Sequence, residues 1–338
     1  MKPADPGRAP TDPSEAKKKA KIEQAKSAAN TFEAIAAELL NKKRSENKAE
    51  RTIEKMEWLL GMAKSALDAR PIKEIEAADI LALLRPVETR GNFETAKKLR
   101  ATIGQVFRYA VATGRVGSDP TRDLKGAIAS PGPRHRAPIV KEKPFGALLR
   151  SIADYEGAPE TRSALELLAL TFVRPGELRS AEWREFDLER ALWVIPAEKM
   201  KMRRDHRVPL APRAVELLRN LHSIMGKGRF LFPSVRSAAR CMSENTLNAA
   251  LRRLGFKQDE MTSHGFRAAA ASIMNESGQW NADAIEAQLA HVDGNAVRRA
   301  YARADYWDER VKMMAWWAGK CDELRSGGSV VPLQARGA

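Results

Sequence analysis

A proline-rich stretch near the middle of the chain, AIASPGPRHRAP over residues 127–138, most limits how the chain can fold. It carries three prolines, and proline has no backbone N–H to give to a helix or a sheet. Such a stretch favours an extended linker, and the 338 residues of the chain are enough for two domains. We therefore predict that the chain divides into five segments. They cover residues 1–30, 31–125, 126–138, 139–320 and 321–338.

The half of the chain before the linker favours helices. Residues 1–30 are rich in lysine, alanine and proline, which predicts a disordered or solvated basic segment. From Thr31, a suitable N-cap, apolar residues recur at helical spacing, and one helix is expected to end before Pro86. Four helices joined by short loops predict a small bundle over residues 31–125.

The half after the linker mixes helices with two short strands. LWVIP at 192–196 and RVPL at 207–210 are typical of strands, and the polar turn between them favours a β-hairpin. The predicted fold class is therefore mainly α with a small β-hairpin or sheet. The tail over residues 321–338 has glycines and few apolar anchors. We expect it to dock on a neighbouring protomer rather than on its own domain.

Charge points to a polyanionic partner. The net charge is +15 and the pI about 9.9, which favours nucleic acid. No apolar run is long enough to span a bilayer, and the two cysteines form neither a disulfide framework nor a metal-ligand cluster. We therefore predict a cytoplasmic protein that has no membrane partner and requires neither a metal nor a cofactor. The candidate DNA contacts, each with a solvated polar surface as its alternative, are Lys97, Lys98, Arg100, Arg108, Arg134, Arg136, Lys199, Arg203 and Arg204.

The stretch that begins SHGFR carries the clearest candidate chemistry. His264 and Arg267 fall at a predicted helix start, His291 lies just past a helix end, and Tyr301 follows a loop. Arg174 precedes a proline that suits the first position of another helix. Basic groups beside exposed backbone N–H groups suit a bound phosphate. The alternative is an H-x-x-R pair that arises by chance and a tyrosine that packs in a core.

Four separated motifs resemble one family in their order and spacing. They are TFVRPGELRSAEW at 171–183, IPAEKMKMRRDHRVPL at 195–210, SHGFR at 263–267, and LAHVDGNAVRRAYARADYWDERVKMMAWW at 289–317. The chain resembles the tyrosine recombinases, and among them the bacteriophage-type and genomic-island integrases. Residues 78–116 are similar to the helical core-binding domain of these integrases. The resemblance implies a fold in which the helical core-binding bundle is followed by a tyrosine-recombinase-type catalytic domain.

The resemblance also implies roles for individual residues. Arg174 takes the place of the first catalytic arginine, and His264 and Arg267 that of the H-x-x-R pair. His291 matches the later histidine. Lys201 stands eight positions before the proline of V-P-L, which matches the hairpin lysine, with Lys199 as its rival. The match to the nucleophile is Tyr301, and its rival is Tyr306, which lies farther past the later histidine than the family spacing suggests.

As an activity, the resemblance implies DNA integration or excision. An integrase cleaves and rejoins double-stranded DNA at attachment sites through a 3′-phosphotyrosyl intermediate, and it acts as a homotetramer. A host bending factor or an excision factor would be a further partner, and the protein would be nucleoid-associated in a bacterial cell. The usual N-terminal arm-binding domain is expected to be lacking. The alternatives are a type IB topoisomerase and a degraded integrase that only binds DNA.

Overall fold

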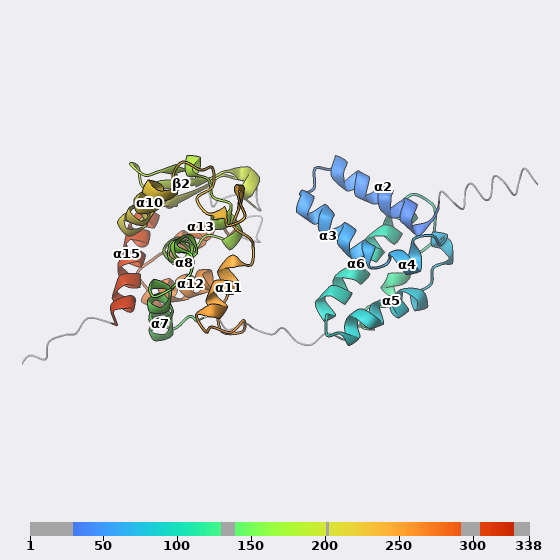
Figure 1. Ribbon diagram of the computed structural model, residues 1–338. Helices are drawn as coiled ribbons and strands as arrows, with labels where there is room; N and C mark the ends of the chain where they lie inside the picture. The colour runs from blue at the N-terminus through green and yellow to red at the C-terminus, as the bar shows by residue number, and fades with distance from the viewer. Residues whose placement is uncertain (1–29, 130–138, 201–202, 292–304, 328–338) are drawn as a thin grey trace, which may run out of the picture. The chain divides into compact units, whose positions relative to one another are not determined.

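Two compact units make up the chain, one over residues 1–134 and one over 135–338. The structure, a computed structural model, describes residues 30–129, 139–200, 203–291 and 305–327 (Figure 1). Each unit buries an apolar core of its own. We refer to them as the N-terminal unit and the C-terminal unit.

The N-terminal unit is a helical bundle built around its longest helix. In chain order its elements are α2 (Phe32–Ser45), α3 (Glu50–Gly61), α4 (Lys64–Leu67), the 3-10 helix η1 (Ile72–Glu74), α5 (Ala77–Thr89), α6 (Phe93–Ala112) and the 3-10 helix η2 (Pro120–Arg122). Helix α6 packs against α2, α3 and α5. It buries Leu99, Ile103 and Phe107, whose spacing of four residues places them on one side of the helix.

Local signals set some helix ends in this unit, and packing sets others. The Thr31 side chain caps α2 as expected, since its hydroxyl oxygen accepts from the Ala34 N–H. The expectation that a helix ends before Pro86 is wrong, because α5 runs through it to Thr89. Buried Ile80 and Leu84 hold the helix in the core on the side before the proline. The bundle also extends past residue 125, because Ile128 is buried in its core.

The C-terminal unit is larger and carries the strands. Its helices are α7 (Glu142–Ala153), α8 (Pro159–Thr171), α9 (Pro175–Arg179), η3 (Trp183–Glu185), η4 (Ala197–Lys199), α10 (Pro212–Met225), α11 (Thr246–Arg253), α12 (Gly265–Ser277), α13 (Ala282–Gln288) and α15 (Trp307–Ser326). Helix α8 lies in the middle, packed against α7, α10, α11, α12 and α15 (Figure 1). Six of the seven residues from 164 to 170 are buried, all except residue 166, which explains the apolar sequence of this helix.

Two small antiparallel sheets belong to the C-terminal unit. Strands β1 (Phe186–Asp187), β2 (Leu192–Ile195) and β3 (His206–Pro209) form one sheet in that order, and β4 (Pro233–Ser234) pairs with β5 (Ser237–Cys241). The β2–β3 pair confirms the predicted hairpin. Its register sets Ile195 opposite His206, and both side chains are buried. The pleat therefore points this histidine into the unit.

The last helix corrects the predicted tail. Helix α15 continues to Ser326, six residues beyond the expected boundary at 320. Cys321 and Leu324 are buried, and Arg150 donates to the Leu324 carbonyl at 3.0 Å. A Cβ atom at Gly146 on α7 would lie 2.3 Å from that carbonyl, so only glycine lets the two helices approach this closely. Residues 321–326 thus pack on their own unit, because their apolar side chains follow the helical spacing of α15.

The predicted fold class is confirmed: the chain is mainly helical with small antiparallel sheets. None of the described helices combines the length and the apolar character that a membrane span requires.

Candidate active site

Arg174 lies in the short break between helices α8 and α9. Helix α8 ends at Thr171, the next residue Phe172 has a left-handed φ of +40°, and Pro175 opens α9. Buried Glu177, one turn into α9, accepts from the Arg174 backbone N–H at 2.8 Å and from Nη1 at 2.7 Å. One carboxylate therefore orients both the backbone and the guanidinium of Arg174.

Arg267 lies in the first turn of α12 and joins the ends of two other helices. Its Nη1 donates to the Phe172 carbonyl at 2.9 Å, and its Nη2 donates to the Leu289 carbonyl at 2.6 Å. Burial, and then the nearby charge of Arg174, lower the pKa of Arg267 to about 10. The guanidinium therefore remains charged at neutral pH, and two backbone carbonyls fix its plane.

The C-terminal end of α13 is the anchor of the site. Three consecutive carbonyls, of Gln288, Leu289 and Ala290, accept from His206 Nε2 at 3.1 Å, Arg267 Nη2 at 2.6 Å and Arg174 Nη2 at 3.0 Å respectively. The last carbonyls of a helix have no partner within the helix, and the helix dipole is negative there. Donors from His206, Arg267 and Arg174 thus satisfy the carbonyls at the end of α13, and these carbonyls in turn hold both arginines in place.

His291 follows these carbonyls directly. Its Nε2 lies 3.1 Å from Arg267 Nη2, and its Nδ1 lies 2.8 Å from Glu286 Oε2. A guanidinium can only donate, so Nε2 accepts and the ring proton sits on Nδ1, facing the carboxylate. In this arrangement the Nε2 side of the ring faces Arg267.

His264 stands at the N-cap position of α12, exposed at its surface. Partial burial of the ring lowers its pKa below the ordinary value, and the charges of Arg267 and Arg174 lower it further. The imidazole is therefore neutral at neutral pH and able to accept a proton. His264 stands three residues before Arg267 at the start of the same helix, so both side chains come from one helix end.

Four of the six residues expected to be catalytic come together in the described structure: Arg174, His264, Arg267 and His291. The other two, Lys201 and Tyr301, lie outside the described residues. So do Arg134 and Arg136, two of the expected DNA contacts. Two guanidinium groups and two imidazoles at one helix end can hold the oxygens of a phosphate diester and move protons near it.

Lys199, both a rival for the hairpin lysine and an expected DNA contact, is held inside the unit. Its ammonium donates to the Ser180 carbonyl at 2.6 Å, to Glu182 at 3.1 Å and to Glu185, and its side chain is 16% exposed. The hydrogen bond from Arg229 is the main reason that the pKa of Glu182 falls to about 2, so this carboxylate is ionised. Two carboxylates hold the Lys199 ammonium inside the unit in this structure, and its assignment as a DNA contact stays a prediction.

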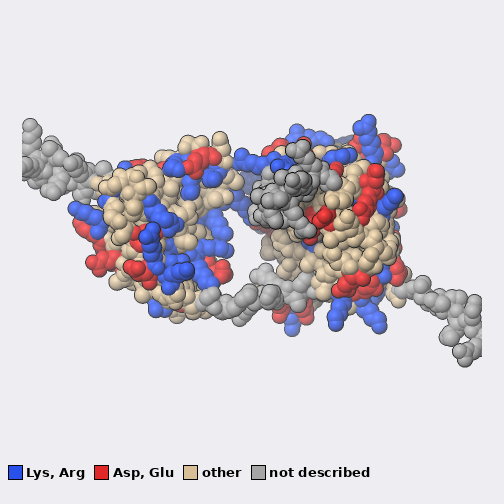
Figure 2. Space-filling view, turned by 180° about the vertical axis from the view of Figure 1, so that it is seen from behind, with Lys and Arg blue, Asp and Glu red and all other residues tan. Residues whose placement is uncertain are grey.

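Several of the other expected DNA contacts already have protein partners. Arg100 donates to the Thr121 carbonyl at 2.9 Å, Arg108 pairs with buried Asp119 at 2.8 Å, and Lys97 lies 3.4 Å from Glu94. Lys98, Arg203 and Arg204 are exposed. Figure 2 shows lysine and arginine side chains gathered over one face of the N-terminal unit, with acidic side chains among them.

Sequence reasoning missed the residues that support the arginines. Glu177 has a local signal, because it stands three residues after Arg174, the spacing at which a side chain reaches back to a helix start. His206, Gln288 and Arg310 have none, since their contacts join segments 22 to 103 residues apart. Among the described residues, no group of three or more His, Cys, Asp or Glu is placed to hold a metal ion.

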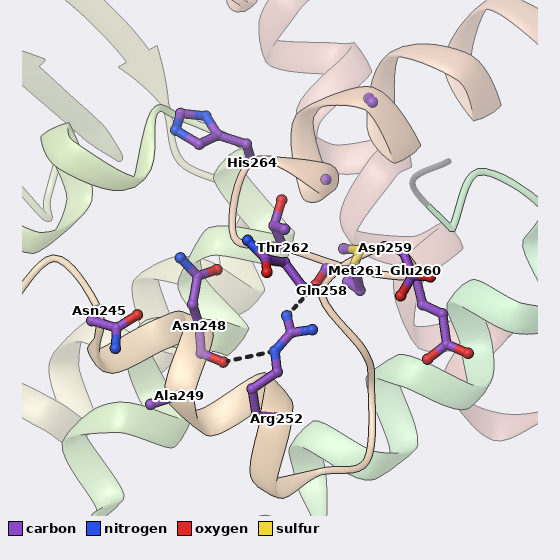
Figure 3. A pocket seen from close by; sticks show the side chains of 12 residues that line it. Asn245, Asn248, Ala249, Arg252, Gln258, Asp259, Glu260, Met261, Thr262 and His264 are labelled. Carbon is purple, nitrogen blue, oxygen red and sulfur yellow. Dashed lines mark hydrogen bonds between the residues drawn. The ribbon is translucent and has the colours of Figure 1, made fainter. Parts of the chain in front are cut away.

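A cavity of about 630 Å³ lies next to the site (Figure 3). Arg252 crosses it and donates from Nε to the Asn248 carbonyl at 3.3 Å and from Nη2 to the Met261 carbonyl. Of the four site residues only His264 contributes to the lining, and the imidazole lies at the edge, apart from Arg252 (Figure 3). We therefore assign the chemistry to the end of α13 rather than to this cavity.

The buried His206 predicts a pH-dependent stability. Burial, and then the charge of Arg310, lower its pKa to about 3. The unfolded chain takes up this proton below about pH 6.5 and the folded chain does not, so stability falls as the pH falls from 6.5 towards 3. Relative to His206→Gln, the wild type should lose about 2 kcal/mol more stability between pH 7 and pH 5.

Urea unfolding followed by tryptophan fluorescence measures this difference, because six of the seven tryptophans lie in the C-terminal unit. An equally steep loss in His206→Gln would contradict the assignment.

Family comparisons agree with this geometry. The family model described as the phage integrase central domain matches residues 32–127, and that of the phage integrase family matches residues 142–307. The chain is 38% identical over 331 residues to an integrase of Enterobacteria phage P4, with 93% of this chain and 74% of that protein covered. It is also 38% identical over 330 residues to the protein IntB of Escherichia coli strain K12, with 93% and 82% covered.

Solved structures show the same fold. A lambda integrase tetramer bound to a Holliday junction matches with a TM-score of 0.64 at 19% identity, over 86% of this chain and 84% of that one. The Tn1549 transposon integrase in complex with circular intermediate DNA matches with a TM-score of 0.56 at 14% identity, over 84% and 99%. The chain belongs to the phage integrase family of tyrosine recombinases, and it is a site-specific DNA recombinase.

Proposed function

We propose that this recombinase cleaves and rejoins double-stranded DNA at attachment sites through a 3′-phosphotyrosyl intermediate, and that it thereby integrates or excises a mobile element. The observation that carries the proposal is the end of α13, which holds Arg174 and Arg267 side by side through consecutive carbonyls. His291 contacts Arg267 at 3.1 Å, and His264 stands three residues before Arg267 at the start of α12. The net charge of +15 suits a DNA partner.

The two arginines would bind the non-bridging oxygens of the scissile phosphate. A guanidinium has five N–H donors, and the bonds described for Arg174 and Arg267 leave donors on each for a phosphate. Because backbone carbonyls and Glu177 already orient both groups, little reorganisation accompanies the build-up of charge in the transition state. His291 would exchange its contact with Arg267 for one with the phosphate. It can donate to a phosphate oxygen from Nε2 only once that nitrogen has taken up a proton, while Nδ1–H still faces Glu286.

Proton movement would fall to His264, Lys201 and Tyr301. The Tyr301 oxygen attacks phosphorus, its proton passes to a base such as neutral His264, and the bond from phosphorus to the 5′ oxygen breaks. Lys201 gives a proton to the leaving oxygen and a free 5′-hydroxyl remains. In the second step a 5′-hydroxyl attacks and tyrosine leaves. One phosphoester bond is broken for each one formed, so the chemistry balances without ATP.

Recombination of two duplexes requires four active sites, so we propose a homotetramer on DNA. The lambda integrase with the same fold is described as a tetramer on a Holliday junction, which supports this assembly. A host bending factor or an excision factor would select the direction of the reaction. The protein would act in the cytoplasm, at the nucleoid.

Covalent capture tests the proposal. The full chain is incubated with a library of random duplexes that carry a nick, the mixture is denatured in detergent, and DNA that remains attached to protein is sequenced. We expect attachment through a 3′ phosphate and enrichment of one core sequence. Binding without any adduct would favour the degraded integrase, and adducts on all sequences alike would favour a topoisomerase.

A further inference from the structure

Arg310 is a buried cation that no step of the proposed reaction uses. It lies in the first turn of α15 and is 1% exposed. Nε and Nη2 donate to Gln288 Oε1 at 3.0 and 2.8 Å, Nη1 donates to Asp305 Oδ1 at 2.6 Å, and Nη2 also donates to the Arg207 carbonyl. Burial lowers its pKa, which reflects the cost of holding a charge there. One side chain therefore joins α15, α13 and β3.

Gln288 accepts two of these bonds. A glutamine at this position lowers the stability of the folded state. It is the last residue of α13 and 0% exposed. Its Oε1 accepts both bonds from Arg310, but its Nε2 has no hydrogen-bond partner among the described residues. A buried donor without a partner destabilises the folded state, and an apolar side chain of similar size would avoid that penalty. The contact with Arg310 is the gain that offsets it.

The same residue begins the row of carbonyls that holds the active-site arginines. The Gln288 carbonyl accepts from His206, and the next two carbonyls accept from Arg267 and Arg174. Because the three peptide units are consecutive, a rotation at Gln288 moves the other two carbonyls and the guanidinium groups bound to them. The Arg310 contact restrains that rotation from the side chain, and His206 restrains it from the backbone.

We propose that Arg310, acting through the side chain of Gln288, is a positioning residue that sets the end of α13 and so aligns Arg174 and Arg267. The inference rests on the proposed roles of these two arginines at the scissile phosphate. It assigns a function to a buried pair that does not itself touch DNA.

Two substitutions at one position separate positioning from packing. Gln288→Met keeps the volume but removes the acceptor, and Gln288→Glu keeps an acceptor and removes the donor that has no partner. The probe is the nicked duplex that the wild type captures covalently. We measure the dissociation constant of the complex and the rate of adduct formation in the saturated complex. Gln288→Met should bind as the wild type does but cleave about 10- to 100-fold more slowly, as expected for misplaced catalytic groups.

Gln288→Glu should cleave close to the wild-type rate, because Arg310 can donate both bonds to its carboxylate. A wild-type rate in Gln288→Met, or an equal loss in both variants, would overturn the proposal. Absence of an adduct from the wild type would instead refute the proposed function, so the two failures are distinct.

Two further variants control for a general loss of packing around α13. Ile285→Val removes a methyl group from a buried position of α13 and leaves the polar partners of Arg310 in place, and it should lower the unfolding temperature without slowing cleavage in the bound complex. Arg310→Lys keeps the charge but lacks the forked donors that reach Gln288, Asp305 and the Arg207 carbonyl together. It should cleave slowly at unchanged affinity, and wild-type cleavage by this variant would also overturn the proposal, even if Gln288→Met fails to fold.

Discussion

Tyr301→Phe should abolish the covalent adduct on nicked DNA and leave DNA binding unchanged. The substitution removes one oxygen, so no atom remains that can form the ester with phosphorus. The ring is retained, and the stability of the chain should change by no more than one lost hydrogen bond, about 1 kcal/mol. The two arginines that we propose bind the phosphate are untouched, so the dissociation constant should stay near the wild-type value. Detergent gels measure the adduct, and gel shifts measure binding.

Tyr306→Phe is the matched control. Tyr306 is the N-cap residue of α15, and its hydroxyl lies 3.5 Å from Asp283 Oδ2, so it has a structural contact that does not involve the arginines. This variant should form the adduct at a rate near that of the wild type. An undiminished adduct in Tyr301→Phe, or loss of the adduct only in Tyr306→Phe, would show that the nucleophile is misassigned.

Arg267→Lys should lower the cleavage rate by about 10²- to 10³-fold, the usual loss when one preoriented transition-state donor is removed. An ammonium is a point donor and cannot hold the Phe172 carbonyl, the Leu289 carbonyl and a phosphate together, as the forked guanidinium does. Two carbonyls are left without their charged partner, which should also destabilise the unit by about 1–3 kcal/mol. DNA binding should weaken little, because one phosphate contact is lost among many.

Arg219→Lys is the control for a general effect of arginine replacement. Arg219 is exposed on α10 and pairs with Glu189 at 2.9 Å, so its loss should change neither cleavage nor binding. Rates of single-turnover cleavage at saturating protein, with unfolding curves for each variant, give the comparison. If Arg267→Lys lost binding and cleavage in equal measure, the residue would be a DNA-affinity contact rather than a transition-state ligand.

Local chemistry made much of the fold predictable from the sequence. Apolar residues at helical spacing foretold α6, Thr31 foretold the start of α2, and the alternating strands foretold the β2–β3 hairpin. These signals work because a cap, a turn or an amphipathic face depends on residues only a few positions apart. The four site residues that come together could be recognised from the sequence for a related reason. Their residue types and their order along the chain form a phosphate-binding pattern that can be seen without knowing the fold.

Tertiary packing decided what no short window of sequence contains. Helix α5 runs through Pro86 and α15 continues to Ser326, because burial against the rest of each unit outweighs a local stop signal. Lys199 looks like a basic hairpin residue in sequence, but two carboxylates from an earlier segment hold it inside. The row of carbonyls at the end of α13 is likewise absent from any motif, since its partners come from α9, β3 and α12. The sequence by itself determined which groups are candidates to bind the phosphate, and only the tertiary structure decided how they are held, because a helix end satisfies its carbonyls with whatever donors the fold brings to it.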